Sequence, residues 1–324
     1  MDAGRGSSLI IEIGRGIFFT SLVFLTVAFV PILSAMMLIM LPLPVLYYFH
    51  KLGRGGGFLI LVVSLLIVGA AQQAVGISFS IAVFIILGAL GLIVSELFRK
   101  RITAGWTVAA AATAGLLVLG GLIIADASWQ GKFPWEHIYT YIYAMVQENI
   151  RLYAQLDLPA EQLQFIKENA EKIALVLTYA FPSLAWISVA AIVIINIIPA
   201  GILFKMRGLD TPEFGPLSRW KTSDHLVWFL IGAGAGILAP WTAVKIISLN
   251  LLIVCCFAYL VQGLAIVEFF FQKKRVPLIL RMLFYFLIVI QQYLLLFVVA
   301  AGLFDLWIDF RKLEAPAKDI DQNH

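Results

Sequence analysis

Charge is what this sequence has least of. Only 13% of its 324 residues are Asp, Glu, Lys or Arg, whereas 62% are hydrophobic and the mean hydropathy is +0.97. Soluble domains carry about 25% charged residues. The composition therefore excludes a soluble globular chain and predicts an all-α fold, a polytopic transmembrane helical bundle with most of its residues in lipid.

Cysteine and histidine are also rare, which limits metal and redox chemistry. The two cysteines, Cys255 and Cys256, are neighbours in one apolar run, so they point to different sides and cannot join distant segments. The four histidines fall in separate loops, at His50, His137, His225 and His324. The sequence contains no H-E-x-x-H motif and no Cys/His cluster, so we predict no metal site.

The sequence lacks the motifs of an ATPase or another enzyme. Its GRGGG segment is not followed by the Lys and Ser/Thr that a G-x-x-x-x-G-K-[ST] phosphate loop requires. No nucleophile, base and orienting residue can be placed together. We predict a protein that is not an enzyme and has no cofactor. The formal charge of +4 does not indicate nucleic acid, because the basic residues lie in short loops between apolar runs.

Long apolar runs are abundant. About 20 apolar residues cross the ~30 Å hydrocarbon layer as a helix. The run 17–49 is too long for one span, and Pro31 in its middle predicts a break. Two runs on either side of the basic turn 273–275 predict a transmembrane hairpin. With the runs between them we predict nine crossings, or eight if 17–49 is one bent helix or 226–238 does not cross.

The basic clusters orient the predicted spans, because cytoplasmic loops carry an excess of Lys and Arg. This rule places the N-terminus, the loop that follows His50, the turn 99–101, the loop 205–225 and the turn 273–275 in the cytoplasm. With nine crossings, the C-terminal tail then lies outside.

One sizeable polar segment, 126–172, interrupts the apolar pattern. It is acidic, and its first half is rich in aromatic residues such as Trp129 and Trp135, a composition typical of the headgroup level. We predict that it forms an outer loop. The predicted domains are an N-terminal bundle 1–204 that contains this loop, a cytoplasmic loop 205–225, C-terminal helices 226–310 and a polar tail 311–324.

Polar residues within the apolar runs are candidate functional residues, because lipid offers them no hydrogen-bond partner. Lys245 either snorkels to the interface or faces an anionic ligand. Gln262 and Gln291 lie at similar depths on the two arms of the hairpin, so they either bond to each other or contact a substrate. The candidate ligand-binding residues are Lys245, Trp129, Trp135, Asn250, Gln262 and Gln291.

Two further interactions are predicted near the basic clusters. In the loop 205–225, the residues Arg219, Trp220 and Lys221 are candidates for docking a cytoplasmic protein or anionic lipid. Glu268 lies close to the basic turn 273–275, so we expect it to pair with that turn or with Arg281.

Several sequence blocks resemble a known family. The block PLSRWKTSDHLVW at 216–228, the apolar run that ends in the basic turn, and DLWIDFRK at 305–312 resemble the YybS-like family, bacterial integral membrane proteins with a domain of unknown function. The six N-terminal helices of such proteins are distantly similar to the S components of energy-coupling-factor transporters. The resemblance implies an inner-membrane, small-molecule-binding transport subunit that needs an energising partner.

The chain departs from an S component in its long outer loop and in three additional helices. The first helix also lacks the A-x-x-x-A pair with which S components dock on their coupling subunit. Two functions therefore remain open. One is a transport subunit whose ligand is covered by the aromatic segment 129–143, and the other is a non-catalytic scaffold or assembly factor that docks cytoplasmic proteins through the loop 205–225.

Overall fold

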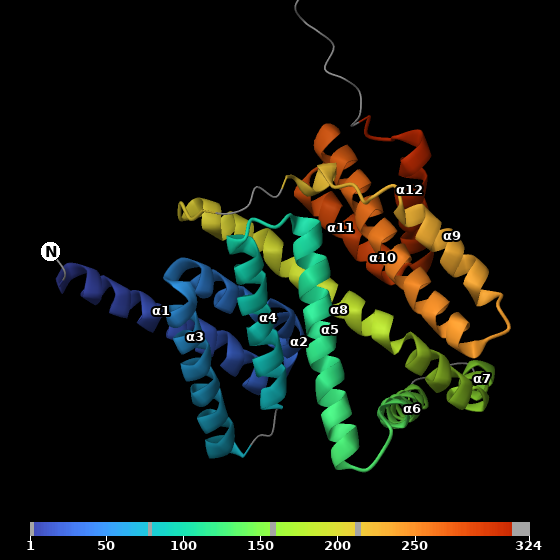
Figure 1. The fold of residues 1–324 in the computed structure, drawn as a ribbon, viewed down its shortest axis with the longest axis horizontal. Helices are drawn as coiled ribbons and strands as arrows, with labels where there is room; N and C mark the ends of the chain where they lie inside the picture. Colours follow the sequence, from blue (N-terminus) through green and yellow to red (C-terminus); the bar gives the residue numbers. More distant parts are fainter. Residues whose placement is uncertain (1–2, 77–79, 156–159, 211–214, 313–324) are drawn as a thin grey trace, which may run out of the picture. The chain divides into compact units, whose positions relative to one another are not determined.

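The structure is a computed structural model that describes residues 3–76, 80–155, 160–210 and 215–312 (Figure 1). Every regular element in these residues is a helix. Six of these helices are long and apolar enough to cross a membrane, or up to seven if a bent pair near the C-terminus is one span. The predicted fold class, a polytopic helical bundle, is confirmed, and this count takes residues 31–75 as a single helical segment.

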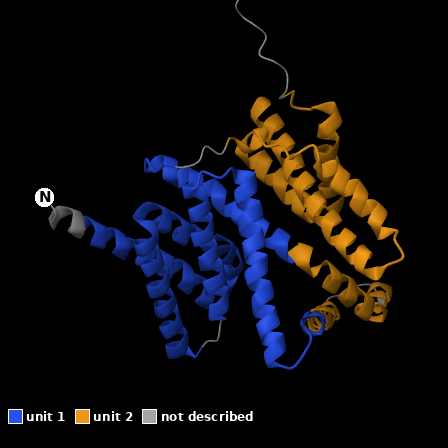
Figure 2. Cartoon of the chain, viewed as in Figure 1, with its two compact units in different colours: residues 1–140, 185–214 blue, residues 141–184, 215–324 orange. Residues whose placement is uncertain are grey.

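The chain forms two compact units (Figure 2). Unit 1 contains residues 1–140 and 185–214, and unit 2 contains residues 141–184 and 215–324. The grouping differs from the predicted division because residues 141–184 associate with the C-terminal helices. Only the first two residues of the predicted tail, Arg311 and Lys312, are among the described residues.

Unit 1 begins with three helices that are separated by prolines. They are α1 (Ala3–Phe29), α2 (Pro31–Met40) and α3 (Pro42–Val75). Pro31 and Pro42 stand at the first positions of α2 and α3, where a missing N–H costs no helical hydrogen bond. The predicted break at Pro31 is therefore confirmed.

The helix α3 is a helical hairpin. Its backbone leaves the helical conformation at Gly53, where φ is 84° and ψ is 177°, a combination that only glycine adopts easily. A Cβ atom on Gly57 would lie 2.5 Å from the Cα atom of Phe49, eight residues earlier. In a straight helix these positions are about 12 Å apart. The chain therefore reverses at Gly53 and forms two arms, 42–52 and 54–75.

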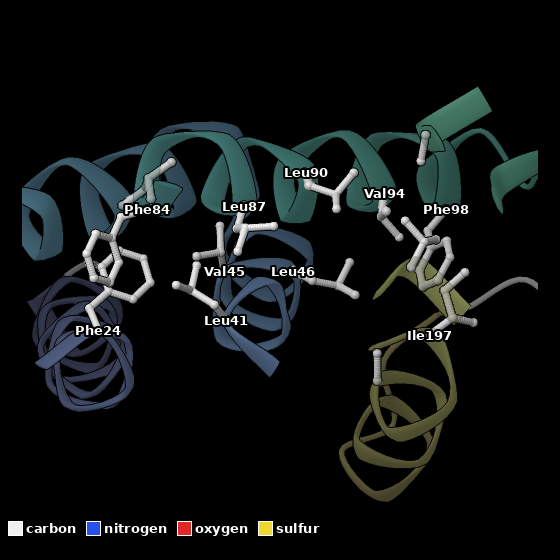
Figure 3. Close-up of a cluster of buried hydrophobic side chains, with 14 of the residues drawn as sticks. Phe24, Leu41, Val45, Leu46, Phe84, Leu87, Leu90, Val94, Phe98 and Ile197 are labelled. Atoms are coloured by element: carbon white, nitrogen blue, oxygen red, sulfur yellow. The ribbon is translucent and has the colours of Figure 1, made fainter. Parts of the chain in front are cut away.

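The remaining helices of unit 1 are α4 (Ile81–Arg99), α5 (Ala104–Trp129), the start of α6 (Pro134–Tyr153) and the second part of α8 (Ala170–Met206). The core of the unit follows one face of α4. Figure 3 shows Phe84, Leu87, Leu90, Val94 and Phe98 on this face, directed toward side chains of α1, of the segment 41–46 and of α8.

Gly91 lets α4 approach the first arm of α3 closely. A Cβ atom there would lie 2.7 Å from the carbonyl oxygen of Pro42. Helices in lipid associate through such close backbone contact, because burial of apolar surface gives them no advantage over lipid contact.

Unit 2 is organised around α10 (Thr242–Lys273). At 32 residues it is about 48 Å long, longer than the hydrocarbon layer. Two close backbone contacts join it to α12 (Gln292–Ile308). A Cβ atom on Gly263 would lie 2.0 Å from the carbonyl oxygen of Val298, and one on Gly302 would lie 2.0 Å from that of Tyr259.

The other helices of unit 2 are shorter, apart from α8. The unit contains α7 (Ala160–Glu168), the first part of α8, the 3-10 turn η1 (Leu217–Arg219), α9 (Leu226–Ile237) and α11 (Leu278–Ile290). The 12 residues of α9 extend about 18 Å, so this helix alone is too short to cross the hydrocarbon layer. It packs against the first part of α10, where Gly236 accommodates Ser248.

The second arm of the predicted C-terminal hairpin is broken. The chain bends by 105° between α11 and α12, with Gln291 at the bend in extended backbone conformation. Just after α12, Arg311 bonds to the carbonyl oxygen of Ser218, and the hydroxyl of Ser218 bonds to Gln272 near the end of α10.

Both ends of the bent pair therefore lie near the C-terminal end of α10, because α11 begins just after the basic turn 273–275 that ends α10. The prediction treated α11 and α12 as one straight crossing, whereas Arg311, just after α12, lies near the same end of α10 as the basic turn.

Candidate functional site

A buried ion pair joins the end of α12 to the linker 215–225. The guanidinium of Arg311 donates to the carboxylate of Asp305 at 2.7 Å, and the two side chains are 0% and 2% exposed. A second nitrogen of Arg311 donates to the carbonyl oxygens of Ser218 at 3.0 Å and Trp220 at 2.8 Å. A buried charge without a partner destabilises a fold by several kcal/mol. Each of these contacts therefore offsets part of the cost of burying the Arg311 guanidinium.

Gln262 belongs to the same network. Its amide nitrogen donates to Asp305 at 3.1 Å, and its amide oxygen accepts the backbone N–H of Thr222 at 3.1 Å. Gln291 lies instead at the bend between α11 and α12 with an exposed side chain. The predicted bond between Gln262 and Gln291 is therefore wrong, and Gln262 has both ends of its amide engaged within the protein.

The network holds the linker's backbone while leaving some of its side chains accessible. Ser218 and Thr222 are bonded to α10 through Gln272 and Gln262, and the carbonyl of Trp220 is bonded to Arg311. Of the three predicted docking residues, Arg219 is exposed and Trp220 is half-buried. The third, Lys221, forms an ion pair with Asp224 at 3.4 Å.

Asn250 cross-links α10 to the first part of α8. Its amide nitrogen donates to the carbonyl oxygen of Tyr179 at 2.7 Å, and its oxygen accepts the N–H of Ser183 at 2.8 Å. These are the two backbone groups that an uninterrupted helix pairs with each other, and Pro182 lies between them. Asn250 therefore has a structural task, and its amide is occupied.

The other candidate ligand residues are exposed. Lys245 lies in the first turn of α10 with an exposed side chain. Trp129, at the end of α5, is 92% exposed and Trp135, in α6, is 39% exposed. The two tryptophans belong to unit 1, whereas Lys245 belongs to unit 2. Within unit 2 the structure does not gather Lys245, Asn250, Gln262 and Gln291 into one site.

A second set of ion pairs gathers the basic segments of unit 1. Lys51 pairs with Glu12 of α1, and Arg54 donates to both oxygens of Glu96 at 2.8 Å. Arg99 donates to the carbonyl oxygen of Phe49 at 3.0 Å. The N-terminal helix, the turn at Gly53 and the end of α4 therefore meet at one end of the unit.

The start of the loop 205–225 lies at this end as well. Asp210 pairs with Arg101 at 2.7 Å, and its carbonyl oxygen lies 2.6 Å from Nε2 of His50. The expectation that the basic segments lie together is thus confirmed within unit 1, where they meet at one end. We call this surface the basic end of unit 1.

Glu268 of α10 is engaged by three donors. Arg281 of α11 donates to it at 3.1 Å, the hydroxyl of Tyr285 at 2.8 Å and Gln272 at 3.0 Å. The predicted pairing of Glu268 with Arg281 is confirmed. It fixes the first two turns of α11 against the end of α10.

Two open hollows, one on each unit, are lined by residues other than the candidate ligand residues. One, of about 620 Å³, is lined by Phe49, Arg54, Gly55, Phe58, Leu92 and Glu96. Another, of about 410 Å³, is lined by Glu161, Gln162, Phe165 and Ile166. Across the described residues, no three His, Cys, Asp or Glu side chains gather as a metal site would require.

Residues 18–306 match the family described as predicted membrane protein (DUF2232). The chain belongs to the DUF2232 family. No curated protein matches it, and no solved structure does. The match includes the polar network around Gln262 and Asp305 but ends before Arg311, and the family description gives this DUF2232 member a membrane location without an activity.

Proposed function

We propose that this DUF2232 protein is a non-catalytic subunit of the bacterial inner membrane that docks an acidic cytoplasmic protein on its linker 215–225. The observation that supports this role is the fixation of the linker's backbone by Arg311 and Gln262 while Arg219 remains exposed. A segment that is already ordered loses little conformational entropy on binding. Arginine suits such a surface, because its guanidinium pairs bidentately with carboxylates.

The charge distribution supports a cytoplasmic location for the linker. In unit 2, the bond between Ser218 and Gln272 brings Arg219 and the basic turn 273–275 to the same end of α10. In unit 1, the basic end collects Lys51, Arg54 and Arg99. The positive-inside rule assigns each of these ends to the cytoplasm, and the N-terminus with them.

Site-specific cross-linking in the host membrane tests the docking role. A photoreactive amino acid in place of Arg219 is expected to capture one cytoplasmic protein, and the same residue in place of Lys245, at the other end of α10, is expected not to capture it. The partner's acidic residues at the cross-link are then changed to Lys. This charge reversal should abolish capture by a chain with wild-type Lys221 and restore it when Lys221 is changed to Glu. Equal capture from both positions would contradict the proposal.

A small-molecule-binding transport subunit is the second candidate, similar to the S components that the YybS-like resemblance suggests. Unit 1 favours it, because this unit contains six apolar helical segments: α1, α2 with the first arm of α3, the second arm of α3, α4, α5 and the second part of α8. The ligand would have to bind in unit 1, since Asn250 and Gln262 are engaged within unit 2.

Native mass spectrometry of protein extracted from its host's membranes separates the two candidates. A stoichiometric small molecule that co-purifies with ATPase subunits supports the transport role. An empty protein that retains the partner cross-linked at Arg219 supports the docking role.

A further inference from the structure

Three basic side chains at the end of α10 form no hydrogen bond or ion pair with other described residues. Lys273, Lys274 and Arg275 are exposed in the turn that joins α10 to α11. Basic side chains at a helix C-terminus ordinarily bond to the last carbonyl groups and offset the helix dipole. Here other groups satisfy those carbonyls.

The backbone and Arg281 cap the end of α10. The N–H groups of Lys274 and Val276 donate to the carbonyl oxygens of Phe270 and Phe271, each at 2.9 Å. Arg281 donates to the carbonyl oxygens of Val276 at 2.8 Å and Phe271 at 3.3 Å. None of these bonds to the carbonyl groups uses the side chains of the three basic residues.

The carboxylates near the turn are already engaged. Glu268 accepts bonds from Arg281, Tyr285 and Gln272. In the described residues, none of the ion pairs includes Lys273, Lys274 or Arg275, although the ammonium of Lys273 lies 5.8 Å from the ring centre of Phe269. Arg219 adds a fourth exposed cation nearby, since Ser218 contacts Gln272 at 3.2 Å.

Apolar surface begins directly beside these cations. Leu278, Ile279 and Leu280, in the first turn of α11, are 68%, 78% and 53% exposed. In a membrane protein such residues face acyl chains. The surplus of positive charge matches the headgroup of an anionic phospholipid, and the adjacent lipid-facing apolar surface matches its acyl chains.

We propose that the α10–α11 turn binds the phosphate of an anionic phospholipid. Lys274 and Arg275 bond to the phosphate oxygens, Lys273 and Arg219 add to the positive potential, and Leu278–Leu280 lie against the acyl chains. Inorganic phosphate has the same charged group but no chains, so it binds this turn far more weakly.

The test compares two variants with the same change of charge. One carries Lys274→Gln and Arg275→Gln, and the control carries Lys132→Gln and Lys245→Gln, both exposed cations that are not part of the turn. Each protein is exchanged into mixed micelles of phosphatidylglycerol and phosphatidylcholine, and the retained lipids are counted by native mass spectrometry. Two basic groups near an anionic surface change relative affinity by about 30-fold. We expect the first variant to lose its preference for phosphatidylglycerol by about this factor.

Further measurements make the outcome specific. The charge-conserving variant Lys274→Arg with Arg275→Lys should retain the preference, and inorganic phosphate should not displace the lipid. Equal preference in the wild type and the first variant would overturn the proposal. An equal loss in the control, or displacement of the lipid by inorganic phosphate, would overturn it too. Because Arg219 is unchanged in all variants, the result is separate from that of partner docking.

Discussion

The side-chain oxygen of Asn250 accepts the backbone N–H of Ser183 at 2.8 Å, one residue after Pro182 in α8. The same amide donates to the carbonyl oxygen of Tyr179. One side chain of α10 thus binds the two backbone groups that would form a hydrogen bond with each other in an uninterrupted α8.

Replacing Asn250 with Ala should destabilise unit 2 by about 1–2 kcal/mol, because the two backbone groups lose their partner in a low-dielectric environment. Thermal unfolding in mild detergent measures the effect. Asn149→Ala is the matched control, since Asn149 is exposed and bonds only within its own helix, to Met145. Equal loss of stability in both variants would argue against the cross-link.

Substitutions of Asp305 and Arg311 should have strongly non-additive effects on the free energy of unfolding. Asp305→Ala leaves Arg311 buried without its counter-charge, and removing one partner of a buried pair costs about 3–5 kcal/mol. The double variant Asp305→Leu with Arg311→Met should recover much of this stability. Release of the linker 215–225 is measured by proteolysis at Arg219, which should become rapid in the Asp305→Ala variant. Additive effects in the double-mutant cycle of Asp305→Leu, Arg311→Met and their combination would show that the two charges act independently.

The contact between Gly302 and Tyr259 should not tolerate a side chain. Gly302→Ala places a methyl group 2.0 Å from a backbone oxygen that cannot move aside without separating α10 and α12. We expect a loss of at least 2 kcal/mol, of the order that overpacking causes in close-packed interiors. Gly234→Ala in α9 is the control, because nothing lies within 4 Å of its Cβ position. Unfolding midpoints of the two variants should differ clearly, with the control close to the wild type.

Thiol labelling tests the return of α11 and α12 to one end of α10. Single cysteines at Lys274, Lys312 and Lys245 are introduced after Cys255 and Cys256 are changed to Ala. An impermeant maleimide should label Lys274→Cys and Lys312→Cys from the same side of the membrane, and Lys245→Cys from the opposite side. If the first two positions react from opposite sides, the bent pair crosses the membrane.

The sequence was sufficient for the features that depend on a local rule. Pro31 predicted a helix break, since a proline N–H is missing wherever proline stands, and the break occurs there. The positive-inside rule predicted that the basic segments of unit 1 lie together. The ion pairs of Lys51 and Arg54 confirm this arrangement. The ion pair of Glu268 and Arg281 could be predicted from the sequence because both residues lie near the turn 273–275.

The sequence was insufficient where the outcome depends on a tertiary partner. Gln262 could bond to any amide at its depth, and its actual partner, Asp305, sits at the end of a helix whose direction is set by the bend at Gln291. Nothing in the apolar run 278–308 marks that bend. The role of Arg311 was missed for the same reason, because the backbone oxygens that it binds carry no sequence signal.

The bend at Gln291 also has a consequence for biosynthesis. A straight second arm would require the charged residues Asp309, Arg311 and Lys312 to be translocated, whereas the bent pair leaves them on the side from which they emerge. The bend itself carries only Gln291 and Gln292, which are uncharged, so a bend within the hydrocarbon layer avoids the cost of about 2.5–3.5 kcal/mol for each charge placed at the bilayer centre.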